Sequence, residues 1–423
     1  MEQSSSMNSG RLDSTPAHLF RKVGARGTAL PLPTGEGWGE GERPAPFRNA
    51  ASLNDSSADT QFNQLALDLF ALQFAHVSPY RTFCQSQRVT PDSITHWRQI
   101  PALPTAAFKN FELTSLPEHE RHFVFHSSGT TALRPSRHFH NAESLALYEA
   151  SLRPWFSAHL MADPDAGREI QARVSPPNFQ IICLTPNPAE VPHSSLVHMF
   201  EIVRRELGAP ASVFTGTVDP DGAWRLDMRK TLACLHQAIS TNQSVVLLGT
   251  AFSYVHLLDQ LAAQKTSLTL PSNSRVLETG GYKGRSRTLP KVELHALTTQ
   301  FLGIPPGRIV CEYGMSELCS QAYDLVVADG PNSQPSTPHP PRRFHFPPWT
   351  RVQIISPESG REVAEGETGL LRVCDLANVR SVMALQTEDL AIRRGDGFEL
   401  IGRAALAEPR GCSLMASRES AVP

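Results

Sequence analysis

The feature that most constrains the fold is a series of short apolar, β-type runs, each of which leads directly into a polar or glycine-bearing loop. Helical patterns separate the runs; residues 141–160, for example, carry apolar side chains at helical spacing. Strands that alternate with helices predict an α/β domain with a substantially parallel sheet, and ligands of such sheets bind at the carboxyl ends of the strands. The four runs are Phe179 to Leu184 (FQIICL), Val245 to Leu248 (VVLL), Arg275 to Leu277 and Arg308 to Cys311.

Composition narrows the classes of protein to which the chain can belong. Its 39 basic and 41 acidic residues give a net charge of −2, and no basic stripe with interleaved aromatic residues occurs, which argues against a nucleic-acid partner. No apolar run approaches the length of a membrane span. The seven cysteines include no Cys-x-x-Cys pair, and their odd number disfavours a disulfide framework or a structural zinc site. Because an apolar secretory signal is also lacking at the N-terminus, we expect a cytoplasmic protein.

The distribution of apolar residues predicts several segments. Residues 1–58 are rich in Ser, Gly, Pro, Arg and Glu and are expected to be a disordered extension. Order is expected to begin near Gln61, in an amphipathic helix that runs toward Cys84. Short antiparallel strands are predicted between Val352 and Ile401. The predicted division is an extension over 1–58, an α/β body over 59–330, a Pro-rich linker over 331–348, a small β subdomain over 349–415 and a tail over 416–423.

A hydroxyl-rich loop follows the apolar residues Phe123 to Phe125. The six residues His126 to Thr131 (HSSGTT) carry four hydroxyl groups and one glycine. A strand that enters such a loop exposes several backbone N–H groups and side-chain donors in one concavity, which suits the oxygens of a phosphate. The alternative is a Ser/Thr-rich surface turn. The candidate phosphate contacts are Ser127, Ser128, Gly129, Thr130 and Thr131.

Two further loops carry residues suited to a nucleotide. Gly280 and Gly281 would allow the backbone to approach a flat base closely, and Tyr282 could stack on that base. Glu317 offers the hard oxygen ligand that Mg²⁺ requires. The alternative for such a carboxylate is a helix cap or a solvated surface position.

A fourth predicted loop, Gln386 to Asp389, has Gly402 and Arg403 just beyond it. Asp389 could accept two hydrogen bonds from ribose hydroxyls, and Arg403 could contact a phosphate or the ribose. The four loops together therefore supply groups for the phosphates, the base, a magnesium ion and the ribose of one nucleotide.

In this order, the motifs resemble those of the adenylate-forming superfamily, which includes acyl-CoA synthetases, firefly-type luciferases and the adenylation domains of peptide synthetases. Ser127 to Thr131 is similar to its phosphate loop, Tyr313-Gly314-Met315-Ser316-Glu317 to its Tyr-Gly-x-Thr-Glu signature, and Thr387-Glu388-Asp389 to its Thr-Gly-Asp. The fuller strings HSSGTT, ETGGYKG, EYGMSEL and EPRGCSL resemble the LuxE-type acyl-protein synthetases, which activate fatty acids for the aldehyde supply of bacterial bioluminescence. The resemblance covers roughly residues 60 to 415.

The chain departs from the superfamily in ways that bear on catalysis. Ala132 to Arg137 replaces the Gly and Pro-Lys that continue the phosphate loop in other members, so a cation over the phosphates would come from Arg134 or Arg137. Glu388 replaces the middle glycine of Thr-Gly-Asp. The chain stops about twenty residues after Arg403, so we expect the mobile lid domain, which supplies a catalytic lysine in long members, to be absent. Lys283, an arginine or a partner protein would then supply that charge.

The resemblance implies the fold of the adenylate-forming N-terminal domain, mostly parallel sheets with a small antiparallel β subdomain. It implies ATP and Mg²⁺ as cofactors, with Tyr313, Gly314 and Ser316 among the nucleotide-binding residues. It implies a two-step reaction, in which a carboxylic acid, expected to be fatty, forms an acyl-adenylate and the acyl group then passes to a cysteine. Cys412 matches the acceptor position of the family. A reductase or an acyltransferase would receive the acyl group.

Two other functions stay open. An acyl-CoA ligase resembling phenylacetate-CoA ligase would use coenzyme A in place of a protein thiol, although the missing lid residues argue against it. A non-catalytic nucleotide-binding subunit could instead organise a reductase complex. Cys412 itself could also be an inert, packed residue.

Overall fold

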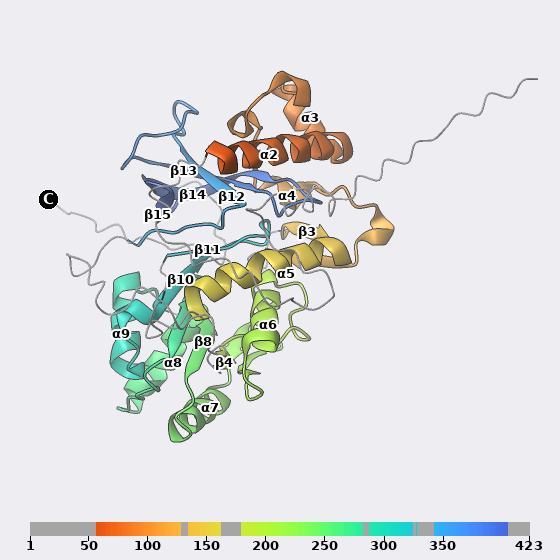
Figure 1. Ribbon diagram of the computed structural model, residues 1–423. Coiled ribbons are helices and arrows are strands. Elements are labelled where there is room, and N and C mark those ends of the chain that lie inside the picture. The colour runs from red at the N-terminus through yellow and green to blue at the C-terminus, as the bar shows by residue number, and fades with distance from the viewer. Residues whose placement is uncertain are drawn as a thin grey trace, which may run out of the picture.

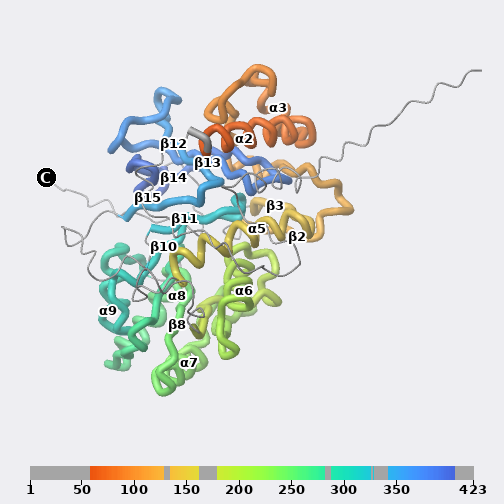
Figure 2. Tube along the Cα trace, in the orientation of Figure 1, coloured from red at the N-terminus to blue at the C-terminus, as the bar shows by residue number. Residues whose placement is uncertain are grey.

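The computed structural model describes residues 56–127, 134–161, 179–281, 287–324, 327 and 342–404. In Figure 1 these residues form a mainly parallel sheet, drawn in green to cyan, and an antiparallel sheet, drawn in blue. Helices α6 to α9 accompany the first sheet, and helices α2 and α3 lie beside the second. The tube in Figure 2 shows the same arrangement, with α5 crossing between the two sheets. Among the described residues, no helix is long and apolar enough to cross a membrane.

The mainly parallel sheet confirms the central prediction from the sequence. Its strand order is β11-β10-β9-β8-β4-β5, in which all neighbours are parallel except β10 and β11. The chain passes from β4 to β5 on one side and then to β8 on the other, so the order reverses at β4. Such a reversal opens a crevice at the carboxyl ends of the central strands. The strands are β4 (Gln180–Cys183), β5 (Val213–Phe214), β8 (Val245–Gly249), β9 (Arg275–Glu278), β10 (Ile309–Tyr313) and β11 (Ala322–Tyr323).

Alternate residues of these strands enter two hydrophobic clusters, one on each face of the sheet. Ile182 and Leu247 pack with helices α7, α8 and α9, whereas Ile181 and Leu248 face the cluster that the two sheets share. Helices α7 and α8 each begin at a polar cap, where a side-chain oxygen accepts a backbone N–H of the first turn. The helices of this part are α5 (Ala142–Phe156) with the π-helical turn η5 (Ser157–Met161), α6 (Ser195–Leu207), α7 (Met228–Ser240), α8 (Ala251–Ala263), α9 (Lys291–Leu302) and the 3₁₀ turn η6 (Pro306–Arg308).

The antiparallel sheet has the order β1-β14-β13-β12, with β15 also paired to β14. Strand β1 precedes the predicted phosphate loop in the chain and runs parallel to β14, so this sheet is built from both ends of the described sequence. The division into the predicted segments stays a prediction. The strands are β1 (Leu103–Pro104), β12 (Thr350–Ile355), β13 (Thr368–Asp375), β14 (Ala384–Arg394) and β15 (Gly397–Arg403).

Two strand pairs and several short helices complete the described fold. The hairpin of β2 (Phe123–His126) and β3 (Arg137–His140) carries the predicted phosphate loop at its tip. A second pair is β6 (Gly216–Val218) with β7 (Trp224–Leu226). The N-terminal helices are α2 (Ser56–His76), α3 (Ser78–Ser86), α4 (Ala107–Asn110) and the 3₁₀ turns η2 (Pro91–Ser93), η3 (Trp97–Gln99) and η4 (Glu118–Glu120).

Two expectations from the sequence need correction. The helix predicted from Gln61 toward Cys84 is in fact two helices, α2 and α3, which are separated by Val77. Pro79, near the start of α3, explains the break because it has no N–H to donate and restricts the backbone of the residue before it. The segment Gln386 to Asp389, predicted as a loop, lies inside β14, the longest strand described. Arg403 likewise lies in β15 rather than beyond a loop.

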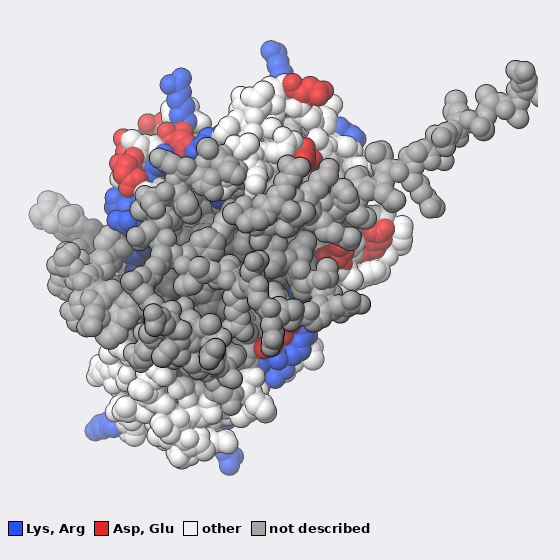
Figure 3. All heavy atoms as spheres, viewed as in Figure 1, with Lys and Arg blue, Asp and Glu red and all other residues white. Residues whose placement is uncertain are grey.

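The described surface carries both signs of charge. In Figure 3, acidic and basic side chains stand close together near the antiparallel sheet. Ion pairs of that sheet include Arg393 with Glu362 and Arg394 with Glu399, each at 3.1 Å. This part of the surface therefore presents mixed charge, in keeping with the near-zero net charge of the chain.

Candidate functional site

The carboxyl edge of the parallel sheet carries buried hydroxyl groups that have no hydrogen-bond partner among the described residues. These groups are the Oγ1 atoms of Thr185, which follows β4, and of Thr279, which follows β9. An unpaired buried hydroxyl costs free energy unless a ligand or water satisfies it. This edge of the sheet therefore offers two unpaired hydroxyl groups to a polar ligand or to water.

The glycine pair predicted to approach a base lies at this edge. Gly280 and Gly281 adopt φ values of 32° and 83°, a left-handed backbone that favours glycine. Their carbonyl oxygens accept hydrogen bonds from the N–H groups of Ala251 and Phe252, at 3.3 Å each, so the turn rests on the start of α8. Tyr282 and Lys283, the next predicted site residues, lie outside the described residues.

The base of the predicted phosphate loop is closed by serine contacts. The Ser127 Oγ atom accepts the Ser136 N–H at 2.9 Å, and the Ser127 N–H donates to the Ser136 carbonyl at 3.3 Å. These bonds extend the β2–β3 ladder by one position and hold the two ends of the loop together. The remaining predicted phosphate contacts, Ser128, Gly129, Thr130 and Thr131, lie outside the described residues.

The hairpin is tied to the loop that follows β10. The His138 Nδ1 atom lies 2.8 Å from the Ser316 carbonyl oxygen. In the same loop, a Cβ atom on Gly314 would collide with the end of the Glu312 side chain, so a larger residue would have to displace that carboxylate. The structure thus brings the hairpin that flanks the predicted phosphate loop next to the predicted metal-binding loop, through two residues that are 178 positions apart in the sequence.

Glu317 is a buried carboxylate in this loop. It is 1% exposed, and its Oε2 atom accepts the Ser316 hydroxyl at 3.0 Å. Its backbone carbonyl accepts the side chain of Asn378 at 2.8 Å, which fixes the residue to the turn between β13 and β14. A hard oxygen ligand held in this way fits a magnesium ion by its donor chemistry.

Asp389 joins three elements in a buried cluster. Its Oδ2 atom accepts the Tyr313 hydroxyl at 2.8 Å, and its Oδ1 atom accepts the Arg403 Nε–H at 3.2 Å. Asp389 and Arg403 are direct partners in the β14–β15 ladder, and Tyr313 ends β10 in the other sheet. The Thr387 hydroxyl accepts the Asp389 N–H at 3.1 Å. Three residues that the sequence assigned to one nucleotide site are therefore in direct contact.

The registers of the sheets place this cluster beside the glycine turn. Cys311 pairs with Glu278 in the β9–β10 ladder, so Tyr313 and Gly280, each two residues further on, reach the same edge. Burial, and then the Asp389 carboxylate, raise the pKa of Tyr313 well above its ordinary value, so the phenol stays protonated as a donor. Burial and then Glu278 raise the pKa of Glu312 to about 8.

One buried carboxylate of this region, Asp375, could not be identified from the sequence. Asp375 is fully buried at the end of β13 and accepts four hydrogen bonds, from Ser320 Oγ, Cys319 N, Ala377 N and Thr350 Oγ1. It belongs to none of the motifs, and its role arises only because β12, β13 and the loop after β10 meet. Cys412, the predicted acyl acceptor, lies outside the described residues.

Comparison with known proteins agrees with this geometry. Two curated relatives are named long-chain-fatty-acid–luciferin-component ligase: the protein of Aliivibrio fischeri is 22% identical over 83% of this chain and 86% of its own length, and that of Vibrio harveyi is 20% identical over 84% and 87%. Among solved structures, an open conformation of 2-hydroxyisobutyryl-CoA ligase matches with a TM-score of 0.57 and 12% identity, over 88% of this chain and 84% of the ligase. That likeness concerns the fold, an α/β architecture with mixed sheets.

The family model described as acyl-protein synthetase, LuxE, matches residues 49–420, which is most of the chain. The match includes all the motifs on which the resemblance rests, together with the segments that contain Tyr282, Lys283 and Cys412. The chain belongs to the LuxE family of acyl-protein synthetases and is an enzyme of that ligase family.

Proposed function

We propose that this enzyme uses ATP to activate a carboxylic acid as an acyl-adenylate and then transfers the acyl group to a cysteine of the protein, for delivery to a reductase or acyltransferase partner. The observation that carries the proposal is the contact of Asp389 with both Tyr313 and Arg403, at the edge where the glycine turn follows β9 and where the β2–β3 hairpin contacts the loop after β10. One nucleotide bound across this edge would satisfy each of these groups.

Each group has a separate task in binding ATP. The Asp389 carboxylate, oriented by two donors, accepts hydrogen bonds from the ribose hydroxyls. The turn at Gly280 receives the base, and the loop that starts at Ser127 cradles the phosphates. Glu317 would hold the magnesium ion, which supplies positive charge to the phosphate oxygens when bound. Lys283 and Arg403 are the basic residues that we assign to the reacting phosphate.

The first step requires positioning and charge neutralisation rather than covalent catalysis by the protein. An oxygen of the substrate carboxylate attacks the α-phosphorus of ATP, and the bond to the leaving pyrophosphate breaks as the new P–O bond forms. The protein holds the two reactants in line and excludes water from the mixed anhydride. Because no side chain is modified in this step, the bound geometry supplies most of the rate enhancement.

The second step is nucleophilic. The Cys412 thiolate attacks the acyl carbonyl and AMP leaves, so one thioester forms for each anhydride consumed. Arg410, two residues away in the sequence, would favour the thiolate form. A fatty acid is the substrate class that we assign, because both curated relatives are named as long-chain-fatty-acid ligases.

Exchange of labelled pyrophosphate into ATP tests the first step, and it is measured on the full chain with a panel of fatty and other carboxylic acids. We expect exchange that depends on the acid and needs no coenzyme A, together with acid-stable acyl label on the protein. The Cys412→Ala variant should lose the label and keep the exchange. Cys234→Ser, which changes a half-buried cysteine on α7, is the matched control and should keep both.

The two alternatives give different results in the same assay. A product that forms only with coenzyme A would identify an acyl-CoA ligase. No exchange with any acid, despite ATP binding measured by calorimetry, would identify a nucleotide-binding subunit without catalysis. If ATP does not bind at all, the proposed nucleotide site is wrong.

A further inference from the structure

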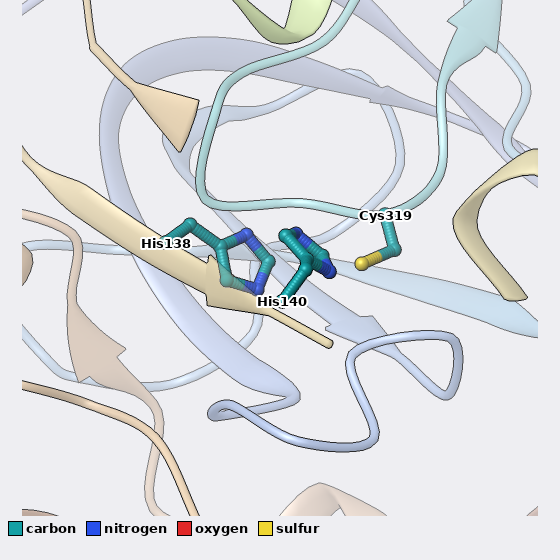
Figure 4. A group of neighbouring side chains, drawn as sticks. All are labelled: His138, His140 and Cys319. Atoms are coloured by element: carbon teal, nitrogen blue, oxygen red, sulfur yellow. The ribbon is translucent and has the colours of Figure 1, made fainter. Parts of the chain in front are cut away.

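Three buried side chains with metal-ligand chemistry meet next to the nucleotide site. His138 and His140 lie two positions apart on β3 and so project from the same face of the strand, and Cys319 comes two residues after Glu317. They are 2%, 1% and 2% exposed, and one ligand atom from each lies within 4.8 Å of the others. In Figure 4 the imidazole of His140 lies between the His138 ring and the Cys319 sulfur, with a ring nitrogen toward that sulfur.

Hydrogen-bond partners favour protonation of Nδ1 in both rings. The Ser316 carbonyl can only accept, so His138 Nδ1, 2.8 Å away, carries the proton. The Ser144 hydroxyl lies 3.4 Å from the Asn141 carbonyl, to which it can donate, and 3.3 Å from His140 Nδ1, from which it can then accept. Both rings then present an unprotonated Nε2 atom, as metal-binding histidines do when Nδ1–H is held by a carbonyl or hydroxyl.

The His140 Nε2 atom is buried and has no hydrogen-bond partner among the described residues. Such an orphaned lone pair inside a core is costly unless something binds it. Burial lowers the pKa of His138, and burial followed by the neighbouring His138 lowers that of His140 further, so both rings are neutral near pH 7 and their lone pairs are available. Burial and then Asp375 raise the pKa of the Cys319 thiol, so a metal would have to displace its proton.

A second group of similar composition has a lysine beside it, which supplies the positive charge that a metal ion would otherwise bring. Glu278, His295 and Cys311 also place ligand atoms within 4.8 Å of one another. There, however, the Lys291 ammonium group is hydrogen-bonded to Cys311 and supplies the positive charge. At the His138, His140 and Cys319 group, by contrast, the charged groups that act on His138 and Cys319 are the Glu317 and Asp375 carboxylates, which favour a cation.

We propose that His138, His140 and Cys319 bind one divalent transition metal ion, for which zinc is the best match. Two imidazole nitrogens and one thiolate form a ligand set that zinc prefers, and magnesium does not. Ligand atoms around tetrahedral zinc stand roughly 3.5 Å apart, and the ligand atoms of this group lie within 4.8 Å of one another, so only small side-chain movements would bring them to the metal. The ligands come from distant parts of the chain, which is why cysteine spacing alone gave no sign of the site.

An ion at this position would link the β2–β3 hairpin to the loop that follows β10. His138 and His140 belong to the hairpin that carries the phosphate loop, and Cys319 belongs to the loop that carries Glu317. The metal would join these two loops beside the His138–Ser316 hydrogen bond. Because the ligands are buried, the ion would enter as the chain folds.

The test measures the metal content of the full chain, expressed with zinc in the medium and dialysed into metal-free buffer, by inductively coupled plasma mass spectrometry. We expect about one zinc ion per chain, and an occupancy at least tenfold lower in Cys319→Ser and in His140→Gln. Cys374→Ser is the control, since Cys374 is equally buried but lies on β13. Refolding with cobalt should give a thiolate-to-metal charge-transfer band that Cys319→Ser lacks.

The wild-type measurement keeps the proposal falsifiable even if the variants fail to fold. A wild-type chain with far less than one zinc ion, both as purified and after refolding in excess zinc, would overturn it. Full zinc retention by a folded Cys319→Ser protein would overturn it as well. Neither readout depends on enzymatic activity, so the outcome is independent of the proposed reaction.

Discussion

Replacing Tyr313 with Phe tests the contact on which the nucleotide site depends. The change removes one hydroxyl and keeps the ring, which packs edge-on against Phe398. The lost bond is a 2.8 Å hydrogen bond to the Asp389 carboxylate, and the two residues are 5% and 7% exposed, so water has little access to replace it. Hydrogen bonds to charged groups contribute about 1.5–3 kcal/mol, and we expect a loss of this size in the free energy of unfolding.

Tyr80→Phe is a matched control for this prediction. Tyr80 is also buried and its hydroxyl also donates at 2.8 Å, but to the neutral carbonyl of Pro101, so its removal should cost only about 1 kcal/mol. Guanidinium unfolding followed by circular dichroism measures both variants, and calorimetry measures their affinity for ATP. Tyr313→Phe should weaken ATP binding, whereas Tyr80→Phe should not. Equal costs for the two variants, with unchanged ATP affinity in both, would refute the reasoning.

Three further changes test other parts of the structure. Gly369→Ala places a Cβ atom 2.6 Å from the Ile355 carbonyl oxygen of the neighbouring strand and should cost about 1–3 kcal/mol in urea unfolding, whereas Gly307→Ala, with nothing within 4 Å, should cost far less. Burial and then Glu278 raise the pKa of Glu312 to about 8, so its contribution to stability is fully present below about pH 4.5 and is lost as the pH rises through 8. Glu312→Gln should therefore flatten the fall in the free energy of unfolding over this range. We expect an effect of less than about 5 kcal/mol, because residue 312 is only partly buried. Ser127→Ala removes one bond at the base of the hairpin and should lower the free energy of unfolding by about 0.5–1.5 kcal/mol, which thermal unfolding would detect.

The sequence predicted the parallel sheet well because its strands are buried on both faces. Strands of that kind are continuous apolar runs, such as Val245 to Leu248, and each is followed by a loop whose polar residues stand out. The order of the motifs was equally informative, since parallel strands end at one edge. For this reason Tyr313 and the glycine turn at Gly280 could be assigned to one site before their contacts were known.

The errors arose where tertiary contacts decide the local structure. Gln386 to Asp389 contains polar and charged residues and was predicted as a loop, yet β13 and β15 pair with it on both sides and bury Thr387 and Asp389 on one face. The pairing with these two neighbouring strands, rather than the composition of the segment, makes it a strand. The same holds for the three buried metal-type ligands, whose proximity depends on the docking of the β2–β3 hairpin onto the loop after β10.

The cluster at Asp389 makes the antiparallel sheet part of the proposed nucleotide site rather than a separate cover. Tyr313 ends a strand of the parallel sheet, whereas Asp389 and Arg403 are ladder partners in the antiparallel sheet. A nucleotide that contacts the Asp389 carboxylate and the glycine turn must therefore bridge the two sheets. Since Phe398 of β15 packs against Tyr313 in the same hydrophobic cluster, any shift between the sheets would disturb both the packing and the carboxylate. If the proposed site is correct, the relative position of the two sheets is consequently the structural variable that sets how well it holds ATP.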